Sequence, residues 1–358
     1  MTLLAQPHAS GRSSMAALAS ALIFAIALFH IQVARGSGLP SDTLYARPSL
    51  LVGDKGVRLS LYCIGSGSPA VIFDSGFSDW APAWSTVQPE IAKWTRACSY
   101  DHAGAGFSDP GPLPRTSLRI AQELHGALHR AGIEGPFILV GHAFGGDQVR
   151  TFADLYMSEV AGLVLVDADA TDLEPEWMQE LDRRGRPDLI SYLRECRNAI
   201  TGHPPLPSGV PAETLQKSCS QKVFFRGLPE VKWSQELNSK MLELAQTKSA
   251  MYDAFVSEME QMTQDEIYLE QHQRSFGARP IRILTSGNHG VPASAPDRAA
   301  YEQEITRAQA RWLGLSSNAK QLFPRSASEY IQFEDPNSVV GAVREVYEEF
   351  KKLPAARD

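Results

Sequence analysis

The stretch FILVGHAFGGDQVR, residues 137–150, decides the fold. FILVG is a short apolar run typical of a buried strand, and the segment that follows has the character of a helix. Gly141, Gly145 and Gly146 surround the junction, and glycine lets a chain turn sharply and lets neighbouring strands approach closely. We therefore predict a strand, a tight turn that lifts Ala143 above the end of the sheet, and a helix whose backbone N–H groups point at the same spot.

Apolar strands alternate with amphipathic helices on both sides of this stretch, which predicts a mostly parallel α/β sheet. Between residues 168 and 279 the alternation stops, and the chain is rich in helix-forming Glu, Gln, Lys, Met and Leu. We expect one sheet domain, 45–167 plus 280–354, with a helical cap over 168–279. The expected strands are 57–63, 70–76, 97–101, 137–141, 161–167, 280–287 and 319–324, and the clearest expected helices are 82–94, 118–131 with Ser117 as N-cap, 144–157 and 339–353.

A strand that runs into Gly-x-Ser-x-Gly and then a helix is a nucleophile elbow. Residues 50–350 resemble the α/β-hydrolase fold family, in its capped esterase/lipase-like branch. The resemblance implies a central sheet with helices on both faces and acyl transfer to a serine. The segments that carry it are AVIFDSGFSDW (70–80), SYDHAGAGFSDPGP (99–112), LVGHAFGGDQVRTFA (139–153), GLVLVDA (162–168) and EYIQFEDP (329–336).

The catalytic triad of that family runs nucleophile, acid, histidine in chain order. Carried over to this chain, the nucleophile position is Ala143 and the histidine position is Glu329. Asp167 is the first choice for the acid, and the alternatives are Asp169, Asp172, Asn288 and Asp297.

Two triad positions therefore lack the residue that the family chemistry needs. Ala143 has no oxygen with which to form an acyl-enzyme. Glu329 is a weak base, because an unperturbed glutamate has a pKa near 4.3. The loss of both groups fits a natural loss of the triad better than a substrate trap made by exchanging the serine alone.

The oxyanion hole depends on backbone groups, which survive side-chain changes. The resemblance implies that the N–H groups of Phe77 and Phe144 form it. His102 and His289 follow strands at the catalytic edge and are secondary candidates for a base, although ordinary loop hydrogen bonds explain both. We expect His142 to be structural and Ser75 to bond to the backbone.

The amino-acid composition limits the kinds of partner that we expect for the chain. The chain has 358 residues, 43% of them hydrophobic, and a formal net charge of -7. No Lys/Arg run breaks the acidic balance, so nucleic-acid binding has little support. No Cys-x-x-Cys or Cys/His cluster indicates zinc, and we expect no metal and no cofactor. The Met, Leu and aromatic residues of the cap predict a small, moderately hydrophobic ligand or substrate.

The N-terminus predicts export. Arg12 precedes an uncharged apolar run, 15–29, and small residues surround Ala34. This pattern is typical of a signal peptide, 1–34, and of a periplasmic or secreted protein. The alternative is an uncleaved segment that anchors the chain in a membrane.

Export permits disulfides among the four cysteines. Cys196 and Cys219 flank a Pro/Gly-rich loop and are the first choice for a pair. Cys63 and Cys98 lie in strand-like runs and could pair across neighbouring strands; the alternative is that some cysteines are buried free thiols.

Three functional hypotheses follow. The first is an exported protein of esterase or amidase lineage that acts on a small ester or amide, without the serine mechanism in this exact chain. The second is a catalytically inactive relative that binds a small ligand. The third is a non-hydrolytic enzyme that uses His102, His289 or Glu329 as a base.

Overall fold

The computed structural model describes residues 42–54, 56–169, 176–203, 213–214, 217–219, 231–287, 298–325 and 328–353. A single eight-stranded sheet forms its centre, in the order β1-β2-β4-β3-β5-β6-β7-β8. Strands β3 to β8 are parallel, and β2 is antiparallel to both of its neighbours. The strands are β1 Leu50–Asp54, β2 Val57–Ile64, β3 Ala70–Asp74, β4 Ala97–Tyr100, β5 Phe137–His142, β6 Val160–Val166, β7 Ile281–Leu284 and β8 Ala319–Leu322.

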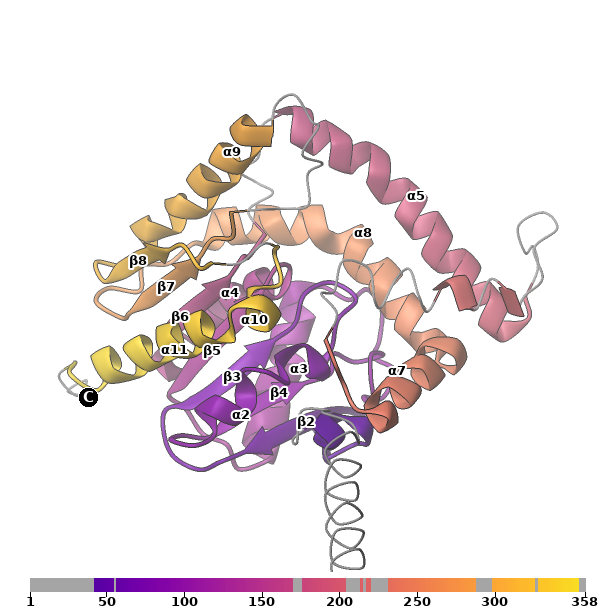
Figure 1. Cartoon of the computed structure of the whole chain (residues 1–358), viewed down its shortest axis with the longest axis horizontal. Coiled ribbons are helices and arrows are strands. Elements are labelled where there is room, and N and C mark those ends of the chain that lie inside the picture. The colour runs from indigo at the N-terminus through magenta and orange to yellow at the C-terminus, as the bar shows by residue number, and fades with distance from the viewer. Residues whose placement is uncertain are drawn as a thin grey trace, which may run out of the picture.

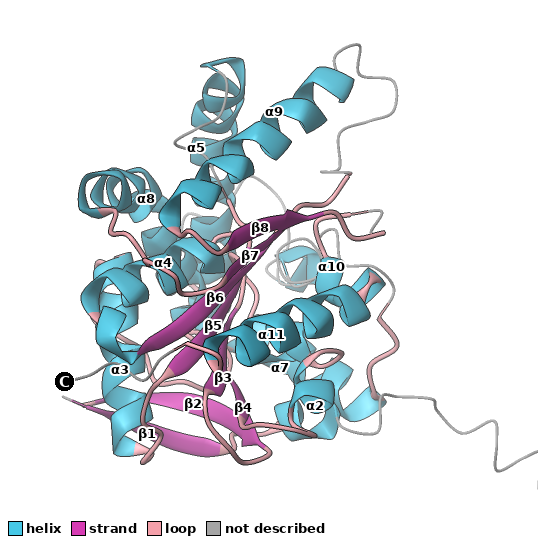
Figure 2. Cartoon of the chain, turned by 90° about the vertical axis from the view of Figure 1, so that its left-hand side faces the viewer, coloured by secondary structure: helices cyan, strands magenta, loops and turns pink. Residues whose placement is uncertain are grey.

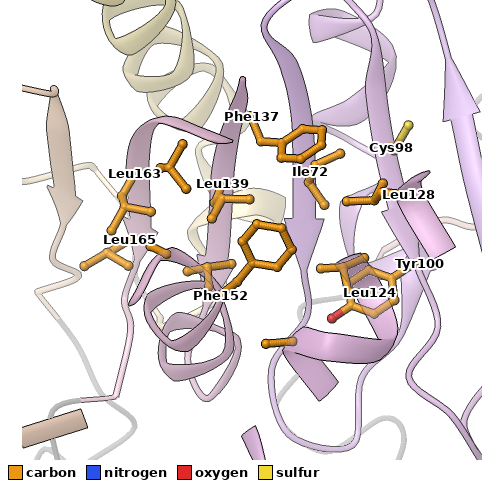
Figure 3. Packing of buried hydrophobic residues seen from close by; sticks show 14 of the residues in the cluster. Ile72, Cys98, Tyr100, Leu124, Leu128, Phe137, Leu139, Phe152, Leu163 and Leu165 are labelled. Atoms are coloured by element: carbon orange, nitrogen blue, oxygen red, sulfur yellow. The ribbon is translucent and has the colours of Figure 1, made fainter. Parts of the chain in front are cut away.

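Helices cover both faces of the sheet (Figure 2). One face packs against α3 (Ser117–Arg130) and α4 (Gly145–Leu155), and Figure 3 shows Leu124 and Phe152 among the strand residues that they bury. The other face packs against α2 (Gln88–Ile91) and α11 (Pro336–Phe350). Strands β3, β5 and β6 are buried along their whole length, which explains why they read as unbroken apolar runs.

The segment between β6 and β7 is helical where the structure describes it. It contains α5 (Glu176–Thr201), α7 (Gln235–Thr247) and α8 (Ser249–His272), drawn in pink to orange above the sheet in Figure 1. Leu193, Leu237, Met251 and Phe255 of these helices belong to one apolar cluster, which also takes in Tyr62 and Trp80 of the sheet domain. They lie where the sequence predicts a cap, and the exact domain boundaries stay a prediction.

The remaining elements are short or peripheral. They are η1 Asp42–Ala46, η2 Ala81–Trp84, η3 Met157–Glu159, α9 Arg298–Ala310, η5 Arg311–Leu315 and α10 Ile331–Glu334. Among the described residues, no helix is long and apolar enough to cross a membrane.

Two local predictions were wrong, and one strand was not predicted. The segment 82–94 is not one helix but η2 followed by α2. Pro82 and Pro89 lie in the first turns of these helices, and a proline in the middle of a longer helix would lack the N–H that bonds to the preceding turn. The N-cap of α3 is Thr116 rather than Ser117, and its hydroxyl accepts from the N–H of Arg119 at 3.2 Å. Strand β1 has only weak sequence signals, because it is a short edge strand that contains Gly53.

Both predicted cysteine pairs form disulfides. Cys63 and Cys98 face each other across β2 and β4, and their sulfurs are bonded. Cys196 of α5 is bonded to Cys219. No described cysteine is free.

Candidate active site

The turn after β5 has the geometry of a nucleophile elbow. Ala143 has a φ of 46°, a left-handed conformation that costs an L-residue about 1–2 kcal/mol. The chain can close there because Gly145 has no side chain: a Cβ at that position would lie 2.6 Å from the carbonyl oxygens of Asp74 and Ser75. Helix α4 starts at once, so its positive end points at the turn.

The loop after β3 carries Phe77, one of the two residues predicted to supply oxyanion donors. A Cβ on Gly76 would lie 3.2 Å from the Cβ of Ala143, so this loop runs directly beside the elbow. Within the described chain, the backbone N–H groups of Phe77 and Phe144 have no acceptor, and the role as oxyanion hole stays a prediction. The hydroxyl of Ser75 donates to the carbonyl of Trp80 at 3.1 Å, which is the backbone bond that we expected.

A pocket of about 240 Å³ opens above Ala143. It brings together Ala143, Glu329 and Asp169, three of the positions that the sequence singles out. Leu189 of α5 closes one side, so the pocket lies between the sheet edge and the helical segment. The described lining residues are Gly76, Phe77, Ser78, Asp79, His142, Ala143, Asp169, Leu189, Glu329 and Tyr330.

Asp79 is a pocket residue that sequence reasoning missed. Its Oδ2 atom is buried and has no hydrogen-bond partner in the part of the chain that the structure describes. Burial and the nearby charge of Glu329 raise the pKa of the Asp79 carboxyl to about 8. The charge of Asp79, followed by burial, raises the pKa of the Tyr330 hydroxyl in turn, so these three side chains form one electrostatic unit. Asp79 falls inside the quoted segment AVIFDSGFSDW, but only the folded chain places it opposite Glu329.

His142 lies beneath the pocket and is neutral. Its Nε2 donates to the backbone carbonyl of Glu329 at 3.2 Å, and its ring packs against that of Tyr330. Burial lowers the pKa of His142 to about 4, although the charge of Asp167 opposes that shift. The bond to the loop before α10 fits the expected structural role.

The predicted acid, Asp167, is engaged away from the pocket. It is buried at the end of β6 with a φ of 42°. Its Oδ1 accepts from the backbone N–H of Ser286 and from Nε2 of Gln309, each at 3.1 Å. The backbone N–H of Asp169 donates to the carbonyl of Ala143 at 3.2 Å, and Asp169 lines the pocket. Of the two carboxyl groups, that of Asp169 is therefore the better placed to act in the pocket.

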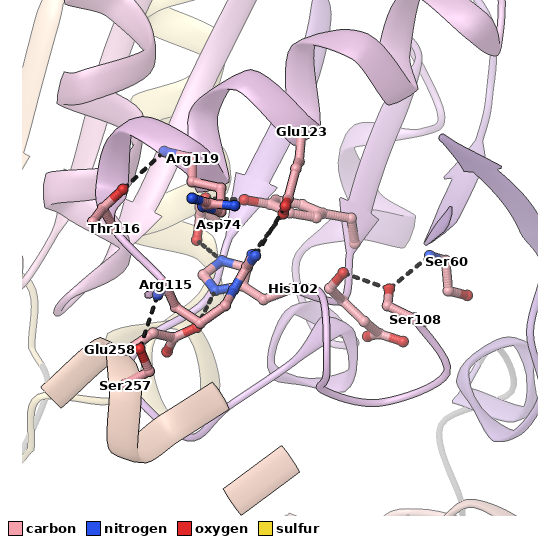
Figure 4. A network of polar contacts seen from close by, with 12 residues as sticks. Ser60, Asp74, His102, Ser108, Arg115, Thr116, Arg119, Glu123, Ser257 and Glu258 are labelled. Atoms are coloured by element: carbon pink, nitrogen blue, oxygen red, sulfur yellow. Dashed lines mark hydrogen bonds and ion pairs between the residues drawn. The ribbon is translucent and has the colours of Figure 1, made fainter. Parts of the chain in front are cut away.

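His102 does not line the pocket. Figure 4 shows it between two carboxylates: its Nε2 is 2.9 Å from Oδ1 of Asp74, and its Nδ1 is 3.2 Å from Oε1 of Glu258 on α8. Burial alone would lower the pKa of His102, but the charges and hydrogen bonds of Asp74 and Glu258 raise it to about 10. A protonated imidazole with both nitrogens engaged is not a base at neutral pH. His289, Asp172, Asn288 and Asp297 lie outside the described residues.

The comparisons with known proteins agree with this architecture. A family model described as the alpha/beta hydrolase fold matches residues 69–203. An alpha/beta hydrolase fold protein from Burkholderia ambifaria superposes with a TM-score of 0.61 at 18% identity and covers 84% of this chain and 98% of its own. A thermophilic esterase from Thermogutta terrifontis gives 0.56 at 19% identity and covers 85% and 99%. Together with the strand order, these matches show that the chain has the alpha/beta hydrolase fold.

The curated relatives match over a smaller share of their own length. The chain is 23% identical over 303 residues to "Probable transporter efuK" of Hormonema carpetanum, across 80% of this chain and 40% of that protein. It is 33% identical over 85 residues to an "AB hydrolase superfamily protein" of Gibberella zeae, across 24% and 26%. The chain thus spans less than half the length of these curated relatives.

Proposed function

We propose that this chain, of hydrolase lineage, binds a small, partly apolar, positively charged ester or amide in the pocket above Ala143 and forms no acyl-enzyme at that position. The observation that carries the proposal is a pocket at the turn after β5, beside the loop after β3, with alanine at the position where the resemblance places the attacking oxygen. Alanine has neither a proton to lose nor a lone pair to attack with.

The charge of the ligand follows from Asp79 and Glu329. Burial and the nearby charge of Glu329, which is itself exposed, raise the pKa of Asp79. Nearby like charges disfavour joint ionisation, and a cation bound beside both carboxyl groups removes that cost. No lysine or arginine is among the described residues that line the pocket.

The apolar character proposed for the ligand follows from the other residues that line the pocket. Phe77, Leu189 and Tyr330 offer hydrocarbon and aromatic surface beside the carboxyl pair. Aromatic faces attract quaternary ammonium groups and add about 0.5–2 kcal/mol. The volume of about 240 Å³ suits a small molecule rather than a polymer.

Calorimetry with two matched probes tests the proposal. Acetylcholine and 3,3-dimethylbutyl acetate have the same shape, and only the first is charged. We expect the chain to bind acetylcholine at least tenfold more tightly, and D79N and E329Q to remove most of that preference. E213Q, which changes an exposed glutamate, is the control. Equal affinity for both probes would refute the charge argument.

A second candidate function rests on the same carboxyl pair. A carboxyl group with a pKa near 8 beside an oxyanion pocket is typical of a catalytic acid or base. Turnover of either ester by the unaltered chain, lost in D79N and E329Q, would favour this candidate. Fluorophosphonate labelling of the unaltered chain, lost in S78A, would instead identify Ser78, the hydroxyl on the oxyanion loop, as a nucleophile.

We also propose that the protein is exported. Two disulfides in the folded chain support an oxidising compartment, as does the apolar run at 15–29. Export can be tested by measuring the intact mass of the protein purified from its native host. We expect a mature chain that lacks residues 1–34, and a retained N-terminus with reduced thiols would contradict the proposal.

A further inference from the structure

A cluster of metal-ligating atoms lies far from the pocket. His125 and His129 stand one turn apart on α3, and Glu159 ends η3 just before β6 begins. They sit where β5 and β6 start, whereas the pocket lies where those strands end. No part of the proposed function uses them.

The three side chains converge on one point. Nε2 of His125 is 2.9 Å from Oε1 of Glu159, and Nε2 of His129 is 3.0 Å from Oε2. The two Nε2 atoms are 3.0 Å apart. Tetrahedral zinc with bonds of about 2.0–2.1 Å holds its ligand atoms about 3.3 Å apart, so each pair needs to separate by only about 0.3 Å.

A carboxylate also contacts the other ring nitrogen of His129, because its Nδ1 is 2.7 Å from Oε2 of Glu134. When the proton of a neutral His129 lies on Nδ1, its Nε2 presents a lone pair toward His125 and Glu159, as a metal ligand does.

The surroundings fix the ligands as a metal site requires. Glu134 on Nδ1 of His129 is the carboxylate–histidine pairing that orients imidazole ligands and raises their basicity. The ring of Tyr156 stacks on that of His125, with centroids 3.7 Å apart and planes 5° apart, which sets the direction of its Nε2. Glu159 itself is only partly exposed.

We infer that His125, His129 and Glu159 bind a divalent transition-metal ion, with zinc as the best fit. Two imidazoles and one carboxylate are ligands that zinc favours, and a set of three leaves a fourth position for water or an outside ligand. The ion would join the C-terminal half of α3 to the start of β6. We expected no metal from the sequence because it has no Cys-x-x-Cys motif or Cys/His cluster. Glu159 is 30 residues from His129 along the chain, and only the fold brings it there.

Zinc binding to protein purified without a histidine tag tests the inference. Equilibrium dialysis and calorimetry with zinc chloride should give one ion per chain, with magnesium chloride unable to compete. H125Q, H129Q and E159Q should each weaken binding more than tenfold, and E134Q, which removes a positioning residue, by about tenfold. H203Q, which changes an exposed histidine, should leave the affinity unchanged.

A second readout separates binding from folding. Cobalt in place of zinc should give a visible absorption spectrum that H129Q abolishes, while far-ultraviolet circular dichroism without metal stays the same. If a ligand variant fails to fold, E134Q still tests the site, because Glu134 is largely exposed. No bound zinc in the unaltered chain, or equal affinity in H125Q, H129Q and H203Q, would overturn the inference. Ligand binding at Ala143 is independent of either result.

Discussion

Ala143 determines which chemistry is open to the pocket. We expect the unaltered chain not to react with fluorophosphonates at this position, because no oxygen is present there. Ala143→Ser alone should gain little, since Glu329 is a poor base and its charge disfavours an anionic tetrahedral intermediate. A143S/E329H should show esterase activity, and the gain should be non-additive because a triad acts as a unit.

Removing an acid from the restored protein distinguishes Asp167 from Asp169. The sequence favours Asp167, yet its Oδ1 is bonded to Ser286 and Gln309, whereas Asp169 lines the pocket. We expect one of the two changes, D167N or D169N, to lower kcat of the A143S/E329H protein by orders of magnitude, and the other to lower it little. The change with the large effect identifies the acid that orients the new histidine. Equal small effects would show that neither residue orients the new histidine.

Asp79 gives ligand binding a pH dependence. Burial and Glu329 raise its pKa to about 8, and a cationic ligand prefers the ionised form. Affinity for acetylcholine should therefore rise as pH increases through 8, by at most about tenfold per unit for one proton released. Titrations between pH 6 and 9 check this, and D79N should flatten the curve. A wild-type affinity that falls over this range would contradict the assignment.

At the scale of elements, α8 is tied to the sheet domain at several points. Ser257 accepts from the N–H of Arg115 at 2.9 Å, and Asp265 accepts from that of Ser117 at 2.9 Å. Glu258 reaches His102, and Asp74 also accepts from the hydroxyl of Tyr100. These bonds hold the helix over the sheet edge that carries the pocket.

The contribution of His102, which joins Asp74 to Glu258, can be tested by measuring the free energy of unfolding. H102Q leaves Asp74 and Glu258 buried without their shared cation, which should cost about 3 kcal/mol or more of the free energy of unfolding at neutral pH. H272Q, on the exposed end of the same helix, should cost little.

The pKa of His102 determines how the stabilisation by the Asp74–His102–Glu258 contacts changes with pH. The folded value is about 10 and the unfolded value about 6.5, so the stabilisation is complete below about pH 6.5 and is lost as pH rises toward 10. The difference between wild type and H102Q should shrink over that range in urea titrations. A difference that grows with pH would rule out a charged His102.

Which elements could be predicted depends on how local their signals are. Strands β3, β5 and β6 are buried on both faces, so their apolar runs identify them directly, and the glycines around Ala143 mark the elbow. Strand β1 is short, lies at the sheet edge and contains Gly53, and the break between η2 and α2 follows from Pro82 and Pro89, so an apolar pattern alone reveals neither. The partner of Glu329 in the pocket was missed because Asp79 is 250 residues away and no local pattern joins them.

At the scale of the whole molecule, the Cys196–Cys219 disulfide restrains the helical segment. It joins residues 23 apart, and both cysteines are buried in the apolar cluster that packs the helical segment against the sheet domain. C196S/C219S should lower the free energy of unfolding by about 2–4 kcal/mol in non-reducing urea titrations. Mass spectrometry should show both disulfides in the unaltered chain, and four alkylated thiols without reductant would contradict their formation.

Helix α8 also leads into β7 after only eight residues, and β7 pairs with β6 inside the sheet. An opening motion that carried the end of α8 outward would act on a strand inside the sheet, so we expect that the whole helical lobe does not swing away as a rigid lid when a ligand enters. Amide hydrogen exchange should show this directly: the N–H groups around Glu258 should exchange on the same slow timescale as those of β7. Exchange faster by several orders of magnitude in α8 alone would mean that the lobe opens independently and that the sheet edge is regularly exposed to solvent.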